Sequence, residues 1–246
     1  MELIKIIVSG DTEIIDDQES VVKIKLIDIT TTDSLMAFGE IRIANEDLSL
    51  NGAFVKDAEI TVALSLGISA PKVVFKGVIS NVIDGQLILL DVRGKAFKWL
   101  NTRVKKSLNK ITPEKIIREI TSQLDGKLEL GEMPKIKRHS YILHNGTIAE
   151  EIHRFNKTFN LNLVPYVDRL GNLILKTLED NVKNTDIAFN DKEFRKFENG
   201  ILETMLDVEV DVFNIIQIMG VGYIVGSHRF FINDRKTKSF ISVTQI

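Results

Sequence analysis

The chain has 246 residues, of which 44% are hydrophobic and 27% charged, so the composition predicts a folded chain with a sizeable core and excludes wholesale disorder. The formal net charge is -2, which gives the chain as a whole no attraction for nucleic acid or for an anionic membrane. The absence of cysteine excludes disulfides and thiolate metal sites, and the sequence predicts neither a signal peptide nor a membrane helix of roughly 20 apolar residues.

The first hundred residues have the pattern of an all-β unit. Ile, Val, Leu and Thr recur in short runs separated by turn residues, and five strands suffice for a small barrel over residues 1–95. The clearest local signal is a hairpin at 83–86, because its Asp-Gly pair suits the positive φ angles of a tight primed turn. The predicted strands are Val21–Ile29, Ala37–Ile43, Ala58–Leu66, Val73–Val82 and Leu87–Arg93.

Residues 96–180 are predicted to form a mixed α/β domain. A threonine, a proline in the first turn and an apolar stripe predict a helix of about three turns over 112–124. A second helix is predicted from Thr147, because apolar residues then recur at intervals of three and four. A hairpin with its connection at 168–172 follows this helix.

The β pattern returns in residues 181–246, which are predicted to form a second barrel. The expected fold is therefore mainly β with an α+β insert, in which two small β-barrel domains flank a mixed α/β domain. The predicted strands of this last part are Leu202–Val212, Asn214–Val225, His228–Asn233 and Lys238–Gln245.

The sequence lacks the common motifs of enzyme sites. Nucleophile elbows, phosphate-binding loops, dinucleotide fingerprints and zinc motifs are all missing. The four histidines are not spaced as a helical i, i+4 pair, so we interpret them as structural or exposed. We therefore predict a non-enzyme with no cofactor, no catalytic residue and no metal site. The histidines are His139, His144, His153 and His228.

A run of basic residues without an acidic one separates the first β unit from the α/β insert. Phe97 and the single tryptophan, Trp99, lie within it. Basic residues beside aromatic ones can bind single-stranded nucleic acid. We favour the alternative in which the aromatic residues anchor the junction of the two units and the charges face water or an acidic partner subunit. The basic residues are Arg93, Lys95, Lys98, Arg103, Lys105, Lys106 and Lys110.

An acidic alternation occurs in the segment Leu206–Val212. A strand there would place Asp207, Glu209 and Asp211 on one face and the valines on the other. Such a face could line a channel through which a polyanion passes, or could meet the basic run of a neighbouring subunit. The simpler interpretation is the solvated side of a half-buried strand.

The order of these pieces resembles the tail hub family, which comprises phage baseplate hub proteins of the late-control-gene-D type and the N-terminal part of type VI secretion spike proteins. GAFVKDAEITVALSLGI followed by VVFKGVISNVI is similar to a first barrel with its "phe-x-gly" strand. ITPEKIIREI and GTIAEEIHRFNKTFNLNLVPYVDRLGNLIL are similar to the middle domain, and ILETMLDVEVDVFNIIQIMGVGYIV is similar to the return into the second barrel.

This resemblance implies a trimer whose two barrels per chain form a pseudo-sixfold ring between a tail tube and a separate spike protein. It implies a location in the tail or baseplate of a contractile injection particle assembled in the host cytoplasm. The implied partners are a second and third copy of the chain, the tube and spike proteins, and tape-measure and baseplate wedge proteins, with DNA only passing through the lumen. The candidate lumen or interface charges are Asp207, Glu209, Asp211, Arg93, Lys95, Lys98, Arg103, Lys105 and Lys106.

Two alternatives from other classes remain. One is a monomeric β-barrel module that binds an oligosaccharide or single-stranded nucleic acid through its barrel face. The scattered aromatic residues, which make up 7% of the chain, do not favour this module. The other is a hydrolase that depends on His144 or His153, for which the sequence suggests no substrate.

Overall fold

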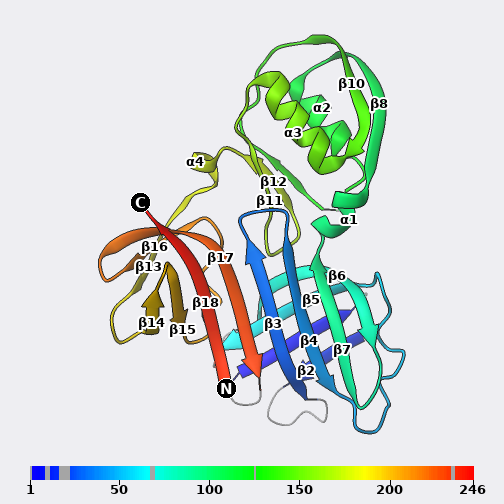
Figure 1. The fold of residues 1–246 in the computed structure, drawn as a ribbon. Helices are drawn as coiled ribbons and strands as arrows, with labels where there is room; N and C mark the ends of the chain where they lie inside the picture. Colours follow the sequence, from blue (N-terminus) through cyan, green and yellow to red (C-terminus); the bar gives the residue numbers. More distant parts are fainter. Residues whose placement is uncertain (1, 9–11, 17–22, 67–69, 125, 234–235) are drawn as a thin grey trace.

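The computed structural model describes residues 2–8, 12–16, 23–66, 70–124, 126–233 and 236–246 (Figure 1). Strands account for 56% and helices for 13%, which confirms the prediction of a mainly β protein. Thirteen of the described strands form one continuous sheet, and the other five form a two-stranded and a three-stranded sheet. None of the described helices is long and apolar enough to cross a membrane.

The N-terminal part of the large sheet consists of antiparallel neighbours in the order β3-β4-β7-β6-β5-β1-β2. All five predicted strands are present within a few residues, although Val21 and Val22 lie outside the described residues. Two further strands at the start of the chain were missed. The seven strands are β1 (Glu2–Val8), β2 (Thr12–Asp16), β3 (Ile24–Thr32), β4 (Ala37–Ala44), β5 (Glu59–Leu66), β6 (Lys72–Ile83) and β7 (Leu87–Gly94).

The predicted hairpin between β6 and β7 is confirmed, but its predicted primed turn is wrong. The last paired residues are Ile83 and Leu89, so the connection is longer than two residues. Neither Asp84 nor Gly85 has a positive φ angle. The length of the connection removes the tight geometry that would require one.

The sheet does not close on itself in the part of the chain that the structure describes, so the predicted closed barrels are not found. Asp16 at the end of β2 accepts a hydrogen bond from the Ile24 N–H at 2.6 Å, yet no ladder joins β2 to β3. The free edge of β3 pairs instead with β17, from Ser227 opposite Thr32 to Asn233 opposite Leu26. This pairing joins the first and last parts of the chain.

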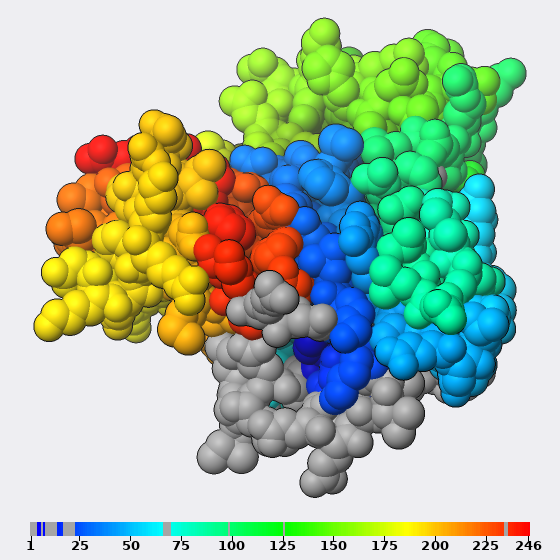
Figure 2. Space-filling view, turned by 60° about the horizontal axis from the view of Figure 1, so that its bottom comes forward, coloured from blue at the N-terminus to red at the C-terminus, as the bar shows by residue number. Residues whose placement is uncertain are grey.

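The C-terminal strands are arranged around the long strand β17. Its first residues pair with β16, its last residues pair with β3, and β18 pairs along most of its other edge. Atoms of β17 accordingly lie directly against those of β3 in Figure 2, with β18 on the other side of β17. The elements are α4 (Leu178–Asn181), β13 (Lys183–Phe189), β14 (Phe194–Glu198), β15 (Ile201–Thr204), β16 (Asn214–Ile218), β17 (Val221–Asn233) and β18 (Lys236–Gln245).

Two predictions for this part need correction, and two strands were missed. The strand predicted over Leu202–Val212 ends at Thr204. The strand predicted over Asn214–Val225 is a hairpin, because Met219 and Gly220 have φ angles of 50° and 79° and reverse the chain. Strands β13 and β14 were not predicted; the burial pattern of β14 does not alternate cleanly, whereas that of β13 alternates over residues 184–189.

Residues 96–180 contain both predicted helices and a separate apolar core. The second predicted helix begins with a capping box in which the Thr147 side chain accepts from the Glu150 N–H and Glu150 accepts from the Thr147 N–H. The buried stripes of the two helices pack on β8 and β10. The elements are α1 (Ala96–Asn101), β8 (Arg103–Ile111), α2 (Pro113–Ile120), β9 (Leu128–Leu130), β10 (Arg138–Thr147), α3 (Ile148–Phe159), β11 (Val164–Val167) and β12 (Leu173–Lys176).

Candidate functional site

The candidate site is one face of the large sheet, across β15, β18, β17, β3, β4 and β7, which we call the open face. Side chains alternate between the two faces of each strand. The opposite face carries buried residues such as Ile27, Ile41 and Leu90 and packs on the core. The open face carries charged, aromatic and small polar side chains, and the strands that form its centre lie side by side at the front of Figure 1.

Arg229 on β17 is the centre of the open face. Its Nε and Nη2 donate to the two carboxylate oxygens of Asp28 on β3, each at 2.6 Å. Its guanidinium also lies 5.7 Å from the ring centre of Phe231 and 5.6 Å from that of Phe240. The bidentate carboxylate pair raises the pKa of Arg229, because its hydrogen bonds favour the charged form.

Further cations lie beside aromatic rings on both sides of Arg229, and one of them also has an acidic partner. Lys238 forms an ion pair with Glu203 and lies 5.8 Å from the Phe240 ring centre. On the far side, the Arg93 guanidinium lies 5.8 Å from the ring centre of Phe38. Each of these cations therefore already has a carboxylate or an aromatic ring as a neighbour in the same chain, and the face has charges of both signs.

The basic residues of the run 93–110 do not form one patch in the structure but lie in different surroundings. Arg93 lies on the open face, whereas Lys95 is largely buried and pairs with Glu59 at 3.4 Å. Lys106 pairs with Glu119 at 2.5 Å. Arg103 donates to the Asn145 carbonyl at 3.2 Å, and Lys105 is exposed. Lys98 lies in α1, and its side chain is outside the described part.

The aromatic residues of this run behave differently from one another. Trp99 is 3% exposed and packs in the core of residues 96–180, as predicted for an anchor of the junction. Phe97 is 41% exposed, so it is much less buried than Trp99. It lies with Met36 and Phe38 in a small apolar hollow of about 30 Å³ beside Arg93.

The structure does not place the three carboxylates of the acidic alternation on one strand face. The segment is irregular, although its valines are buried as the alternation predicted. Asp207 accepts from the backbone N–H groups of Glu209 and Val210, at 2.7 Å and 3.2 Å. Glu209 pairs with Lys72, and Asp211 pairs with Arg169 at 3.3 Å. Burial raises the pKa of Asp211, and Arg169 opposes that shift.

A buried Ser–His pair lies beneath this segment, and sequence reasoning missed it. His228 Nδ1 is 3.1 Å from the Val210 carbonyl oxygen, which only accepts, so Nδ1 carries the proton. Nε2 therefore accepts from the Ser239 hydroxyl at 2.9 Å. Both residues are fully buried, and burial lowers the pKa of His228 to about 4. A substrate cannot reach this pair, so the arrangement is structural.

The remaining titratable groups do not form a second centre among the described residues. His139, His144 and His153 are exposed, and no group of histidines and carboxylates is placed to hold a metal ion in the described part of the chain.

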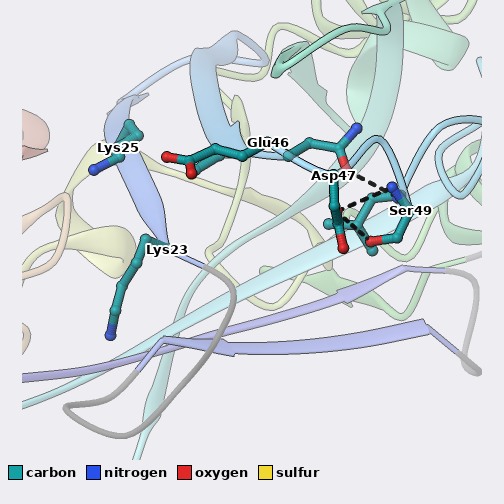
Figure 3. Close-up of a pocket in the computed structure, with 8 residues that line it drawn as sticks. Lys23, Lys25, Glu46, Asp47 and Ser49 are labelled. Atoms are coloured by element: carbon teal, nitrogen blue, oxygen red, sulfur yellow. Dashed lines mark hydrogen bonds between the residues drawn. The ribbon is translucent and has the colours of Figure 1, made fainter.

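A pocket of about 300 Å³ lies near the start of β3 (Figure 3). Lys23 and Lys25 line one side of it, and Glu46, Asp47 and Ser49 of the loop after β4 line the other. The Ser49 backbone and hydroxyl donate to Asp47 and lower its pKa.

No family model matches the chain, and no curated protein matches it. Solved structures match along its whole length. The 43 kDa tail protein of prophage MuSo2 from Shewanella oneidensis has a TM-score of 0.74 at 11% identity, and the match covers 100% of this chain and 98% of that chain. The tail protein from Neisseria meningitidis MC58 has a TM-score of 0.68 at 10% identity, over 98% and 96%.

The E. coli c3393 protein, a component of the type VI secretion system, is similar in the same way. Its TM-score is 0.65 at 10% identity, and the match covers 98% of this chain and 77% of that chain. At such identities the likeness shows a shared fold.

Proposed function

We propose that the chain is a non-enzymatic structural protein of the tail or baseplate of a phage or phage-like contractile injection particle. The observation that carries this proposal is the likeness to two tail proteins over nearly the full length of both chains. The type VI secretion component with the same fold supports the same class of particle. The buried Ser–His pair, which has no path for a substrate, agrees with a structural role.

Within that particle, we propose that three copies form a pseudo-sixfold ring between the tail tube and the spike. The two β regions of each chain would supply the six positions, and the β3–β17 pairing would hold them at a fixed angle. Tube and spike proteins would be the direct partners, with tape-measure and baseplate wedge proteins nearby.

The open face is the surface that we propose for the lumen of this ring. Its cations are neutralised within the chain by Asp28 and Glu203 or covered by aromatic rings. DNA is retained by cations that can replace its counterions. A face whose cations already have partners would let DNA pass. We therefore propose Arg93 as a lumen residue and Arg103 and Lys105 as residues that contact a neighbouring subunit.

The ring is tested by light scattering on the purified chain, alone and mixed with the tube and spike proteins of the same genome. The expected mass is three times the 27.8 kDa of one chain, and electron micrographs should show rings. A chain that stays monomeric in every mixture would contradict the ring, and binding of an oligosaccharide or an oligonucleotide by that monomer would favour the binding module.

The proposal that the open face lines the lumen can be tested by cysteine labelling. The chain has no cysteine of its own, so an introduced cysteine is the single site that a maleimide labels. Thr30→Cys places one thiol on the open face, and Lys157→Cys places one on the exposed surface of α3. After assembly, a small maleimide should label both variants, whereas a maleimide with a large polymer tail should label only Lys157→Cys. Equal labelling by the large reagent would place the open face outside the ring.

A further inference from the structure

Residues 96–180 have an excess of positive charge that the rest of the chain does not share. They contain fifteen Lys and Arg residues against ten Asp and Glu residues, although the whole chain is slightly acidic. Most of the described carboxylates of this part are used internally. Glu114 pairs with Arg118, Glu119 with Lys106 and Glu129 with Lys176, and Glu150 caps α3.

Several lysines of this part have no acidic partner among the described residues. Those at positions 110, 115, 135 and 137 are exposed and have no ion pair among the described residues. Arg138 pairs with Ile111 across the β8–β10 ribbon, and Lys135 and Lys137 line one pocket with Thr112 and Glu114 at the start of α2. This end of the ribbon therefore offers positive charge to a partner molecule.

A groove of about 620 Å³ opens at the same place. Arg118, Lys135 and Lys137 supply its cations, and Leu130, Met133 and Pro134 supply its apolar surface. Its one carboxylate, Glu114, is already held by Arg118 through contacts of 3.0 Å and 3.1 Å. The groove thus combines an apolar surface with cations that lack a full complement of acidic partners.

The backbone beside the groove is also unpaired. The segment 132–137 connects β9 to β10 without forming helix or strand, and the described structure gives it no backbone hydrogen bond. An extended peptide can pair with such a segment through main-chain hydrogen bonds, while pockets for alternate side chains give specificity. Pro134 lacks an N–H, so the pairing would use the positions around it.

We propose that this groove binds an extended acidic segment of a partner protein, in which carboxylates alternate with aliphatic side chains. The carboxylates would meet Arg118, Lys135 and Lys137, and the aliphatic side chains would meet Leu130 and Met133. A nucleic acid fits less well, because the residues that line the groove include no aromatic ring on which a base could stack. The proposal goes beyond the ring and does not depend on it.

The test uses the full chain and a fluorescein-labelled ten-residue peptide that alternates glutamate and leucine, with binding followed by anisotropy. Lys135→Glu/Lys137→Glu reverses the charge of the groove. Lys192→Glu/Arg195→Glu makes the same change of charge at exposed residues of the C-terminal part that have no described ion pair. Circular dichroism confirms that both variants fold.

We expect the groove variant to bind at least tenfold more weakly than the wild type and the control variant to bind within twofold of it. A peptide that alternates glutamine and leucine should bind at least tenfold more weakly to the wild type. An equal loss in both variants would show unspecific attraction and overturn the proposal. Absence of binding, or tighter binding of a labelled oligo-dT of the same length, would overturn it as well. None of these readouts depends on trimer formation.

Discussion

At the scale of single residues, His228 lies in an environment that opposes its charge. It is fully buried against Phe230, with both ring nitrogens in hydrogen bonds, and its pKa is lowered to about 4 from 6.5. Between these two pH values the unfolded chain binds a proton that the folded chain does not bind. The free energy of unfolding therefore falls as the pH drops from 6.5 to 4, by at most about 3 kcal/mol for this group.

This prediction is measured by urea unfolding of the wild type and of His228→Gln at several pH values from 4 to 7. The stability of the wild type should decrease relative to the variant as the pH falls. Burial raises the pKa of Asp211, which has the opposite effect, but Asp211 is present in both proteins and its contribution largely cancels. His139→Gln is the matched control, because His139 is exposed. A constant difference between wild type and His228→Gln would contradict the prediction.

Glu151 is a second buried titratable residue, and it stabilises the backbone of the neighbouring strand β10. Its carboxylate is fully buried, and Oε1 accepts from the backbone N–H groups of His144 and Gly146 and from Arg154. These bonds hold the bulge in β10 where Asn145 has a φ angle of 64°. A side chain on Gly146 would place its Cβ 2.8 Å from the same oxygen, which explains the glycine.

Substitution of Glu151 by leucine should therefore destabilise the chain strongly. It leaves two backbone donors without a partner, at roughly 1–3 kcal/mol each. Glu151→Gln keeps an acceptor oxygen and should cost less than half as much. The measurement is the free energy of unfolding in urea, with the exposed Glu132→Gln as a control. Equal stability of the leucine and glutamine variants would show that the bulge does not need the acceptor.

At the scale of elements, the structure explains the Phe-Lys-Gly sequence of β6. Phe75 is 1% exposed, and a Cβ on Gly77 would lie 2.6 Å from its ring and 2.0 Å from the Arg93 carbonyl oxygen. Strand β7 can approach β6 at this point only because residue 77 has no side chain. The motif therefore combines a buried aromatic residue with a position that has no room for a side chain.

Gly77→Ala should accordingly disturb the β6–β7 pairing. Backbone must move to admit the methyl group, so we expect a loss of about 3 kcal/mol or an insoluble product. Gly85→Ala is the matched control in the connection of the same hairpin, where a Cβ would have only one neighbour, at 3.8 Å. Thermal unfolding should separate the two variants clearly. Similar melting temperatures would contradict the role assigned to Gly77.

The elements also show where sequence reasoning succeeds. The two longer helices of residues 96–180 were predicted because proline, a capping threonine and the apolar stripe are all local signals. The alternation at 206–212 predicted burial of the valines correctly but not the backbone, because buried hydrogen bonds such as that from His228 to Val210 hold the segment in an irregular path. The Arg229–Asp28 pair joins residues 201 positions apart, and no local pattern indicates it.

At the scale of the whole molecule, the chain has more than one core. The main core combines residues of the first β region with Leu206, Val208, Phe230 and Ile232 from the last part of the chain. The core of residues 96–180 is separate and includes Ile152 and Phe155. We therefore propose that residues 96–180 unfold as a unit of their own, while the N-terminal strands and β17 unfold together.

This proposal predicts two transitions in differential scanning calorimetry. Ile152→Ala removes a side chain that is 1% exposed, and Ile27→Ala removes one that is fully buried, so each should cost about 2–5 kcal/mol within its own core. Ile152→Ala should lower the melting temperature of one transition and Ile27→Ala that of the other. The two parts are joined by the Arg169–Asp211 pair at 3.3 Å and by a small apolar cluster in which Tyr166 packs on Phe213. A single transition that both variants shift equally would show that these contacts make the chain one cooperative unit.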